Sequence, residues 1–144
     1  MARQRRLIDP IDFLRRKTKL TPPEIDRQIF PLLSHWWVID RKIHNERSEA
    51  VITQHVVMLQ IFAAQISNKP LYDLTAKAVT LWLSALELSN KRGTPPDLST
   101  SAKKALSQCI TEWHRALKCM NIDTLVYICG RWQEIEQKFI GEAA

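Results

Sequence analysis

The fold is decided by residues 49–67, which read EAVITQHVVMLQIFAAQIS and form the most apolar stretch of the chain. Apolar side chains recur in this stretch at steps of three and four residues, which is the period of an α-helix. They cover so much of the helix circumference that little of it is left for water, as is typical of a helix at the centre of a bundle. The chain contains no run of 18 apolar residues, so we expect no membrane span.

Helix signals on either side of this stretch predict four more helices. The motif Thr21-Pro22-Pro23-Glu24 combines a capping hydroxyl, two first-turn prolines and the glutamate of a capping box. Gly93 and Gly141 are placed to end two later helices. Apolar stripes of helical period run through residues 25–43, 71–88, 102–120 and 125–139. No segment alternates with the period of a strand, so the sequence predicts an all-α, single-domain bundle of about five helices over residues 21–144.

The net charge of +6 is concentrated at the N-terminus. Residues 1–20 hold seven basic residues against Asp9 and Asp12, a net charge of +5, whereas the other 124 residues hold 14 basic and 13 acidic residues, a net charge of +1. The seven are Arg3, Arg5, Arg6, Arg15, Arg16, Lys17 and Lys19. Residues 1–20 are therefore interpreted as a basic N-terminal arm that attracts a polyanion.

Nucleic acid is a polyanion that this arm fits, because arginine forks pair well with phosphate and contact the backbone without reading bases. A solvated terminus that only aids solubility is an equally good interpretation of the charge. The leading hypothesis is a non-enzymatic accessory protein whose arm contacts DNA or RNA phosphates while the bundle docks a protein partner. The alternative is a protein-only adaptor or chaperone whose arm enters the groove of an acidic partner. Its inserted residues would be Ile8, Ile11, Phe13 and Leu14. A monomer and a homodimer both remain open.

Two adjacent tryptophans suggest where a partner would dock. Neighbouring residues on a helix point about 100° apart, so Trp36 and Trp37 cannot both face one core. Trp36 falls on the apolar stripe, whereas Trp37 projects near Phe30 and Leu33. These three residues either anchor a partner or are covered by the apolar side chains of the arm. The other tryptophans, Trp82, Trp113 and Trp132, lie on apolar stripes and are predicted to be core residues.

No catalytic or metal motif is recognisable in the chain. The di-metal sites of helical bundles use a Glu three residues before a His, and no histidine here has one. Asp40 and His44, four residues apart, are predicted to form a local salt bridge rather than a metal or acid–base site. An enzyme would need Asp40, His44 and His114 to converge. His35 and His55 lie in apolar surroundings and are predicted to be structural. No cofactor and no metal are expected.

The cysteines indicate a reducing compartment. Cys109, Cys119 and Cys129 are an odd number and form no C-x-x-C motif, so we expect free thiols that pack as small apolar side chains. Cys109 and His114 are five residues apart, on different sides of one helix, which argues against a nucleophilic pair. The N-terminus has no signal-type apolar core. The sequence thus predicts an intracellular, cytoplasmic protein.

The last two predicted helices have some features of a helix-turn-helix. The turn at residues 120–123 has the right size, but a major-groove reader usually presents a basic face. The outward positions of the last helix carry mixed charge instead, at Thr124, Tyr127, Arg131, Glu134 and Lys138. The sequence therefore favours an antiparallel helical pair with a solvated outer face.

Overall fold

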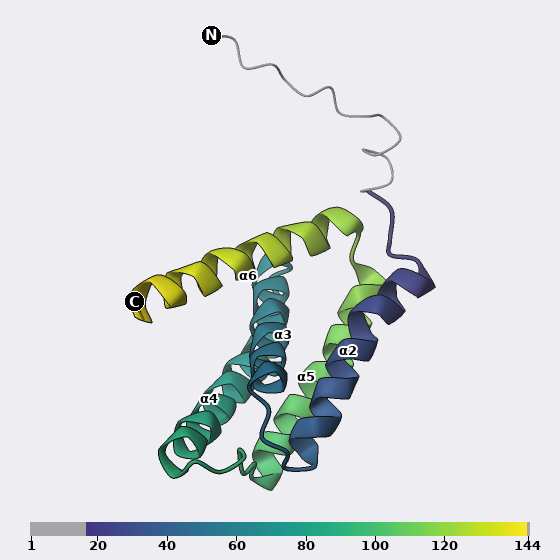
Figure 1. Ribbon diagram of the computed structural model, residues 1–144. Coiled ribbons are helices and arrows are strands. Elements are labelled where there is room, and N and C mark those ends of the chain that lie inside the picture. The colour runs from purple at the N-terminus through teal and green to yellow at the C-terminus, as the bar shows by residue number, and fades with distance from the viewer. Residues whose placement is uncertain (1–16, 144) are drawn as a thin grey trace.

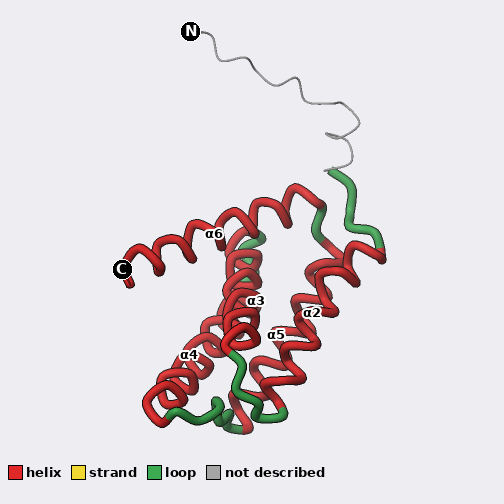
Figure 2. Tube along the Cα trace, viewed as in Figure 1, coloured by secondary structure: helices red, strands yellow, loops and turns green. Residues whose placement is uncertain are grey.

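The computed structural model describes residues 17–143, and their side chains as far as Lys138. These residues form five helices, labelled in Figure 1 and coloured red in Figure 2. They are α2 (Pro22–Asp40), α3 (Glu46–Gln65), α4 (Lys69–Arg92), α5 (Thr100–Cys119) and α6 (Ile122–Ala143). No strand occurs among the described residues. The predicted all-α class and helix number are confirmed, whereas residues 1–16 of the predicted arm lie outside the described part of the chain.

Short polar side chains fix where the helices begin. At α2 the predicted capping box forms, because the Thr21 backbone N–H donates to Glu24 Oε1 at 3.0 Å and the Glu24 N–H donates to Thr21 Oγ1 at 3.4 Å. Asn45, Asn68 and Ser99 cap α3, α4 and α5 in the same position. The helix predicted from residue 49 starts three residues earlier, since Asn45 accepts from the Ser48 N–H.

Glycine closes one helix as expected and fails to close another. Gly93 has φ 63°, the left-handed conformation that ends α4. Helix α6 runs on to Ala143, past Gly141, where the sequence predicted its end.

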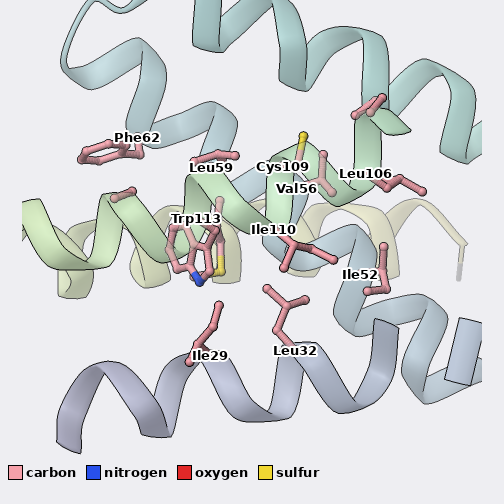
Figure 3. Close-up of a cluster of buried hydrophobic side chains, with 14 of the residues drawn as sticks. Ile29, Leu32, Ile52, Val56, Leu59, Phe62, Leu106, Cys109, Ile110 and Trp113 are labelled. Atoms are coloured by element: carbon pink, nitrogen blue, oxygen red, sulfur yellow. The ribbon is translucent and has the colours of Figure 1, made fainter. Parts of the chain in front are cut away.

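The most apolar stretch, α3, lies at the centre of the fold and contacts each of the other four helices. Leu59 and Ala63 on α3 have no exposed surface. Figure 3 shows Ile29 and Leu32 of α2 pointing toward Trp113 on α5, whose side chain is only 1% exposed. Trp82 is equally buried, and Trp132 packs against the core half-buried. The predicted core tryptophans therefore pack in or against the core.

The arrangement of α6 differs from the prediction. Instead of running antiparallel alongside α5, it runs across α3 (Figure 1). The chain changes direction at Met120, which is extended, and Asn121 Oδ1 accepts from the Thr124 N–H at 2.8 Å to start the new helix. Helices α2, α3 and α4 pack against α5 and leave only its polar side open, so the apolar side of α6 around Ile128 is buried on α3 instead.

His55 is a structural histidine, as predicted. Its Nδ1 lies 2.8 Å from the Val51 carbonyl oxygen, and its ring meets Trp113 edge-on with 5.8 Å between the ring centres. Burial lowers the pKa of His55 below its ordinary value, and the nearby His35 acts in the same direction. His35 Nδ1 in turn lies 2.8 Å from Ser48 Oγ.

This buried imidazole should make the stability of the fold depend on pH. The unfolded His55 binds a proton near its ordinary pKa of about 6.5 more readily than the folded one, so its contribution is present above that pH and lost below it. Relative to His55→Leu, the free energy of unfolding of the natural chain should fall by up to about 1.4 kcal/mol per pH unit below pH 6.5. Urea denaturation at a series of pH values measures this, and parallel curves for the two chains would contradict it.

Candidate nucleic-acid interface

The described end of the arm lies beside the turn between α5 and α6. The Thr18 carbonyl oxygen accepts from the Ile122 N–H at 3.3 Å, and Lys19 pairs with Asn121 in an isolated bridge. Lys17 Nζ lies 3.8 Å from Asp123 Oδ2, and Leu20 is buried. Residues 17–20 are thus held on the bundle. The other five predicted phosphate-binding residues, Arg3, Arg5, Arg6, Arg15 and Arg16, lie outside the described residues.

The outward side of α5 carries a second basic surface, which the sequence analysis missed. Helices α2, α3 and α4 pack against α5 and leave one side of it open. Exposed polar residues occupy that side at helical steps, and we call them the basic face of α5. They are Lys104, Gln108, Thr111, Arg115 and Lys118. From Lys104 to Lys118 this face is about 21 Å long at the rise of an α-helix.

Carboxylates on α5 and on the neighbouring helices hardly reduce the positive charge of the basic face of α5. The only acidic residue of α5 is Glu112, which is half-buried on its flank and accepts from Arg115 Nη1 at 2.7 Å. A surface pair of this kind contributes little, and it leaves the Arg115 guanidinium exposed. Lys103 points to the other flank, where its Nζ lies 3.5 Å from Asp40 Oδ1. The face therefore presents three cations and no outward carboxylate.

The basic face of α5 adjoins the arm. Helix α5 ends at Cys119, and Lys19 is bridged to Asn121 two residues further on. Lys17 and Lys19, the described basic residues of the arm, thus lie at the end of the bundle where α5 ends, with Lys118 in its last turn. The near-neutral total for residues 21–144 concealed this surface, because Lys104, Arg115 and Lys118 are balanced in sequence by carboxylates that lie on other helices. Their helical spacing, with only polar residues between them on that side, is the signal that would have found it.

The three predicted partner-binding residues are exposed and share one side of α2. Phe30, Leu33 and Trp37 are 59%, 43% and 53% exposed, and they are informative because they gather on one side of a helix. We call them the α2 stripe. The guanidinium carbon of Arg41 lies 4.2 Å from the centre of the Trp37 ring, in a cation–π contact. The other interpretation of the sequence, in which apolar side chains of the arm cover this stripe, falls on residues 7–14, which lie outside the described part of the chain.

The α2 stripe lies beside the basic face of α5. The ion pair between Asp40 and Lys103 marks the edge of α2 that faces α5. Leu33 precedes Asp40 by seven residues, so it lies about two helical turns away along the same edge. An apolar stripe and a row of cations therefore border each other on one side of the molecule.

The candidate catalytic residues do not come together. The predicted salt bridge between Asp40 and His44 is wrong, because His44 lies beyond the end of α2 and its Nδ1 is 3.8 Å from Glu49 Oε2. Asp40 pairs with Lys103 instead. His114 is eleven residues from Lys103, about 16 Å further along α5. Within residues 17–143 no cluster of histidine, cysteine and carboxylate side chains could hold a metal ion.

The cysteines behave as apolar side chains where they are buried. Burial raises the pKa of Cys109 to about 12, and it also raises the pKa of Cys129. Cys109 is 2% exposed, so it is neither ionised nor accessible at neutral pH. Cys119 is exposed at the end of α5.

The functional argument for this protein rests on the basic face of α5 and the α2 stripe. Across the described residues, none of the helices combines the length and apolar character needed to cross a membrane. Comparison of the chain with protein-family models, with curated proteins and with solved structures finds no match.

Proposed function

We propose that the protein is a non-enzymatic accessory protein that binds the phosphate backbone of nucleic acids without reading base sequence. The observation that carries the proposal is the basic face of α5, which adjoins the described end of the arm. With the seven basic residues of the arm, Lys104, Arg115 and Lys118 bring to ten the basic residues that we propose contact one polyanion. Two of them, Lys17 and Arg115, also form exposed ion pairs, with Asp123 and Glu112. Such contacts release counterions and bind any sequence with similar affinity.

A protein partner is the second part of the proposal, and the exposure of the α2 stripe supports it. Exposed apolar residues at positions i, i+3 and i+7 of a helix are a common form of docking surface. Aromatic residues such as Trp37 contribute most to the affinity of such surfaces. Because the stripe borders the basic face of α5, a docked partner would sit next to the bound nucleic acid.

Binding across a salt series tests the proposal. Fluorescence anisotropy of the full chain with short single- and double-stranded DNA and RNA should give a log affinity that falls linearly with log salt, whatever the sequence of the oligonucleotide. No binding to any of these near physiological salt would overturn it and favour the protein-only adaptor. A strong preference for one sequence would contradict backbone-only contact.

Neutralising the basic face of α5 should weaken binding without unfolding the protein. In the triple variant Lys104→Gln, Arg115→Gln, Lys118→Gln, we expect the salt slope on duplex DNA to shrink by about 3, one for each lost phosphate contact. The matched control is Lys69→Gln, Lys77→Gln, Lys138→Gln, which removes the same charge from exposed positions on α4 and α6. Equal slopes for the two variants would mean that only net charge matters.

A further inference from the structure

A pocket of about 450 Å³ lies where the described end of the arm meets the last turns of α3 and α5 and the start of α6. Its volume is in the range of about 300–1,000 Å³ that is typical of sites for small ligands. Apolar side chains form part of its wall, namely Phe62 and Ile66 at the end of α3 and Met120 after α5. Ile66 is 49% exposed, so apolar surface is open to a ligand there.

The polar part of the wall comes from the arm and from the turn before α6. Lys17 and Lys19 line the pocket, and the backbone contacts of residues 18 and 19 with this turn hold them there. Asn121 Oδ1 accepts from the Thr124 N–H at 2.8 Å and from the Thr124 hydroxyl at 2.9 Å. Because these two polar groups are bonded to each other, they shape the wall and do not select the hydrogen-bonding pattern of a ligand.

The surroundings of the pocket are strongly basic. Within four residues of a lining residue along the chain, the described part holds five basic residues and one acidic residue, Asp123. Asp123 pairs with Lys17, and Glu112, further back on α5, pairs with Arg115. The basic residues are Lys17, Lys19, Lys69, Arg115 and Lys118. Apolar surface beside this excess of cations fits a ligand that combines a flat ring with a phosphate group.

We propose that this pocket receives an unpaired nucleotide of a bound nucleic-acid strand, with its base against Phe62, Ile66 and Met120. This inference rests on the proposed function and deepens it, because it makes single strands the preferred ligand. The basic face of α5 ends at Lys118, directly before Cys119 of the pocket wall, so a strand that follows this face reaches the pocket. A base in a duplex is stacked and paired, and entry would cost both interactions.

Cys119 reports whether the pocket is occupied, because it lines the pocket and is exposed. Its alkylation by N-ethylmaleimide is followed in the full chain by tandem mass spectrometry, which distinguishes it from the half-buried Cys129. The probe is a mixed-sequence strand of about 12 nucleotides, within the site sizes of single-strand binding proteins. At about ten times its dissociation constant, the strand should slow this alkylation about tenfold, because only the unoccupied chain reacts.

Two further ligands separate entry of a base from coverage by phosphates. A strand of the same length built from abasic nucleotides has the phosphates without the bases, and a fully paired duplex keeps its bases out of the pocket. Both should leave the alkylation rate of Cys119 close to that of the free chain. A cysteine in place of Gln108, on the basic face of α5, is the control for phosphate coverage and should be protected by all three ligands.

A neutral substitution in the pocket supplies a matched pair of variants. Ile66→Ser should weaken single-strand binding about fivefold, the lower end of what one stacked base contributes, and leave duplex affinity unchanged. The control is Leu88→Ser on α4, since Leu88 is also 49% exposed but does not line the pocket. It should leave both affinities unchanged.

The outcomes distinguish this proposal from the proposed function. Protection at position 108 without protection of Cys119 would overturn the proposal alone, as would equal protection of Cys119 by the abasic strand or by the duplex. No protection at either position, with no binding by fluorescence anisotropy, would overturn the proposed function as well. Protection of Cys119 by a free nucleoside monophosphate, in a chain that binds no strand, would assign the pocket to a soluble nucleotide and overturn the strand as its occupant.

Discussion

Replacing the seven basic residues of the arm with glutamine is expected to reduce the salt slope of duplex binding by up to about 6, because each phosphate contact contributes about 0.9. The residues are Arg3, Arg5, Arg6, Arg15, Arg16, Lys17 and Lys19. A slope of about −3 should remain from the basic face of α5, too weak for binding near physiological salt. Fluorescence anisotropy over a salt series measures both values.

Substitution is preferable to removing residues 1–20. Leu20 is buried, and the Thr18 carbonyl oxygen accepts from the Ile122 N–H, so deletion would disturb the fold where α5 meets α6. The substituted chain should have the circular dichroism spectrum and thermal unfolding of the natural chain. A salt slope that stays near the natural value would contradict a role for the arm and leave the bundle as the whole binding site.

Local signals were sufficient to predict the helices. The Thr21 capping box and the left-handed Gly93, which the sequence predicted, depend on neighbours within a few residues. The caps that the structure shows at Asn68 and Ser99 are equally local. The central place of α3 also followed from its own composition. The direction of α6 could not be predicted from its own composition, because it depends on which sides of α5 are already covered by helices distant in sequence.

The surfaces were only partly predictable for the same reason. The sequence predicted that Trp37 points away from the apolar side of its helix, near Phe30 and Leu33, and all three side chains are exposed. That a partner docks on them stays a prediction. The basic face of α5 required knowing which side of that helix remains open. The apolar groove between α3, α4 and α6 could not be predicted from the sequence. Its lining residues Val57, Leu83 and Trp132 come from three helices and meet only in the folded chain. Asp40 likewise found its partner, Lys103, across two helices.

Truncating the buried Trp113 should cost the most stability of any single change considered, whereas truncating the exposed Trp37 should cost little. Trp113 of α5 is 1% exposed and packs against α2 and α3. Trp113→Ala is therefore expected to lower the free energy of unfolding by about 3–5 kcal/mol. Trp37→Ala removes a side chain that is 53% exposed and a cation–π contact with Arg41, with an expected loss of at most about 1 kcal/mol.

Urea denaturation measures the free energy of unfolding of Trp113→Ala and Trp37→Ala. A third variant, Trp113→Phe, separates the effect of side-chain volume at position 113 from the effect of the polar indole N–H. Within the described residues, Trp113 Nε1 is the one buried side-chain nitrogen or oxygen atom without a hydrogen-bond partner. An unpaired buried donor is itself unfavourable, by about 1–3 kcal/mol. Trp113→Phe removes this donor while keeping a ring against His55, so it should lose much less stability than Trp113→Ala.

Equal losses for the alanine variants at positions 113 and 37 would contradict the placement of Trp113 in the core. A folded Trp37→Ala chain that keeps its salt slope would show that the α2 stripe does not contribute to the phosphate contacts.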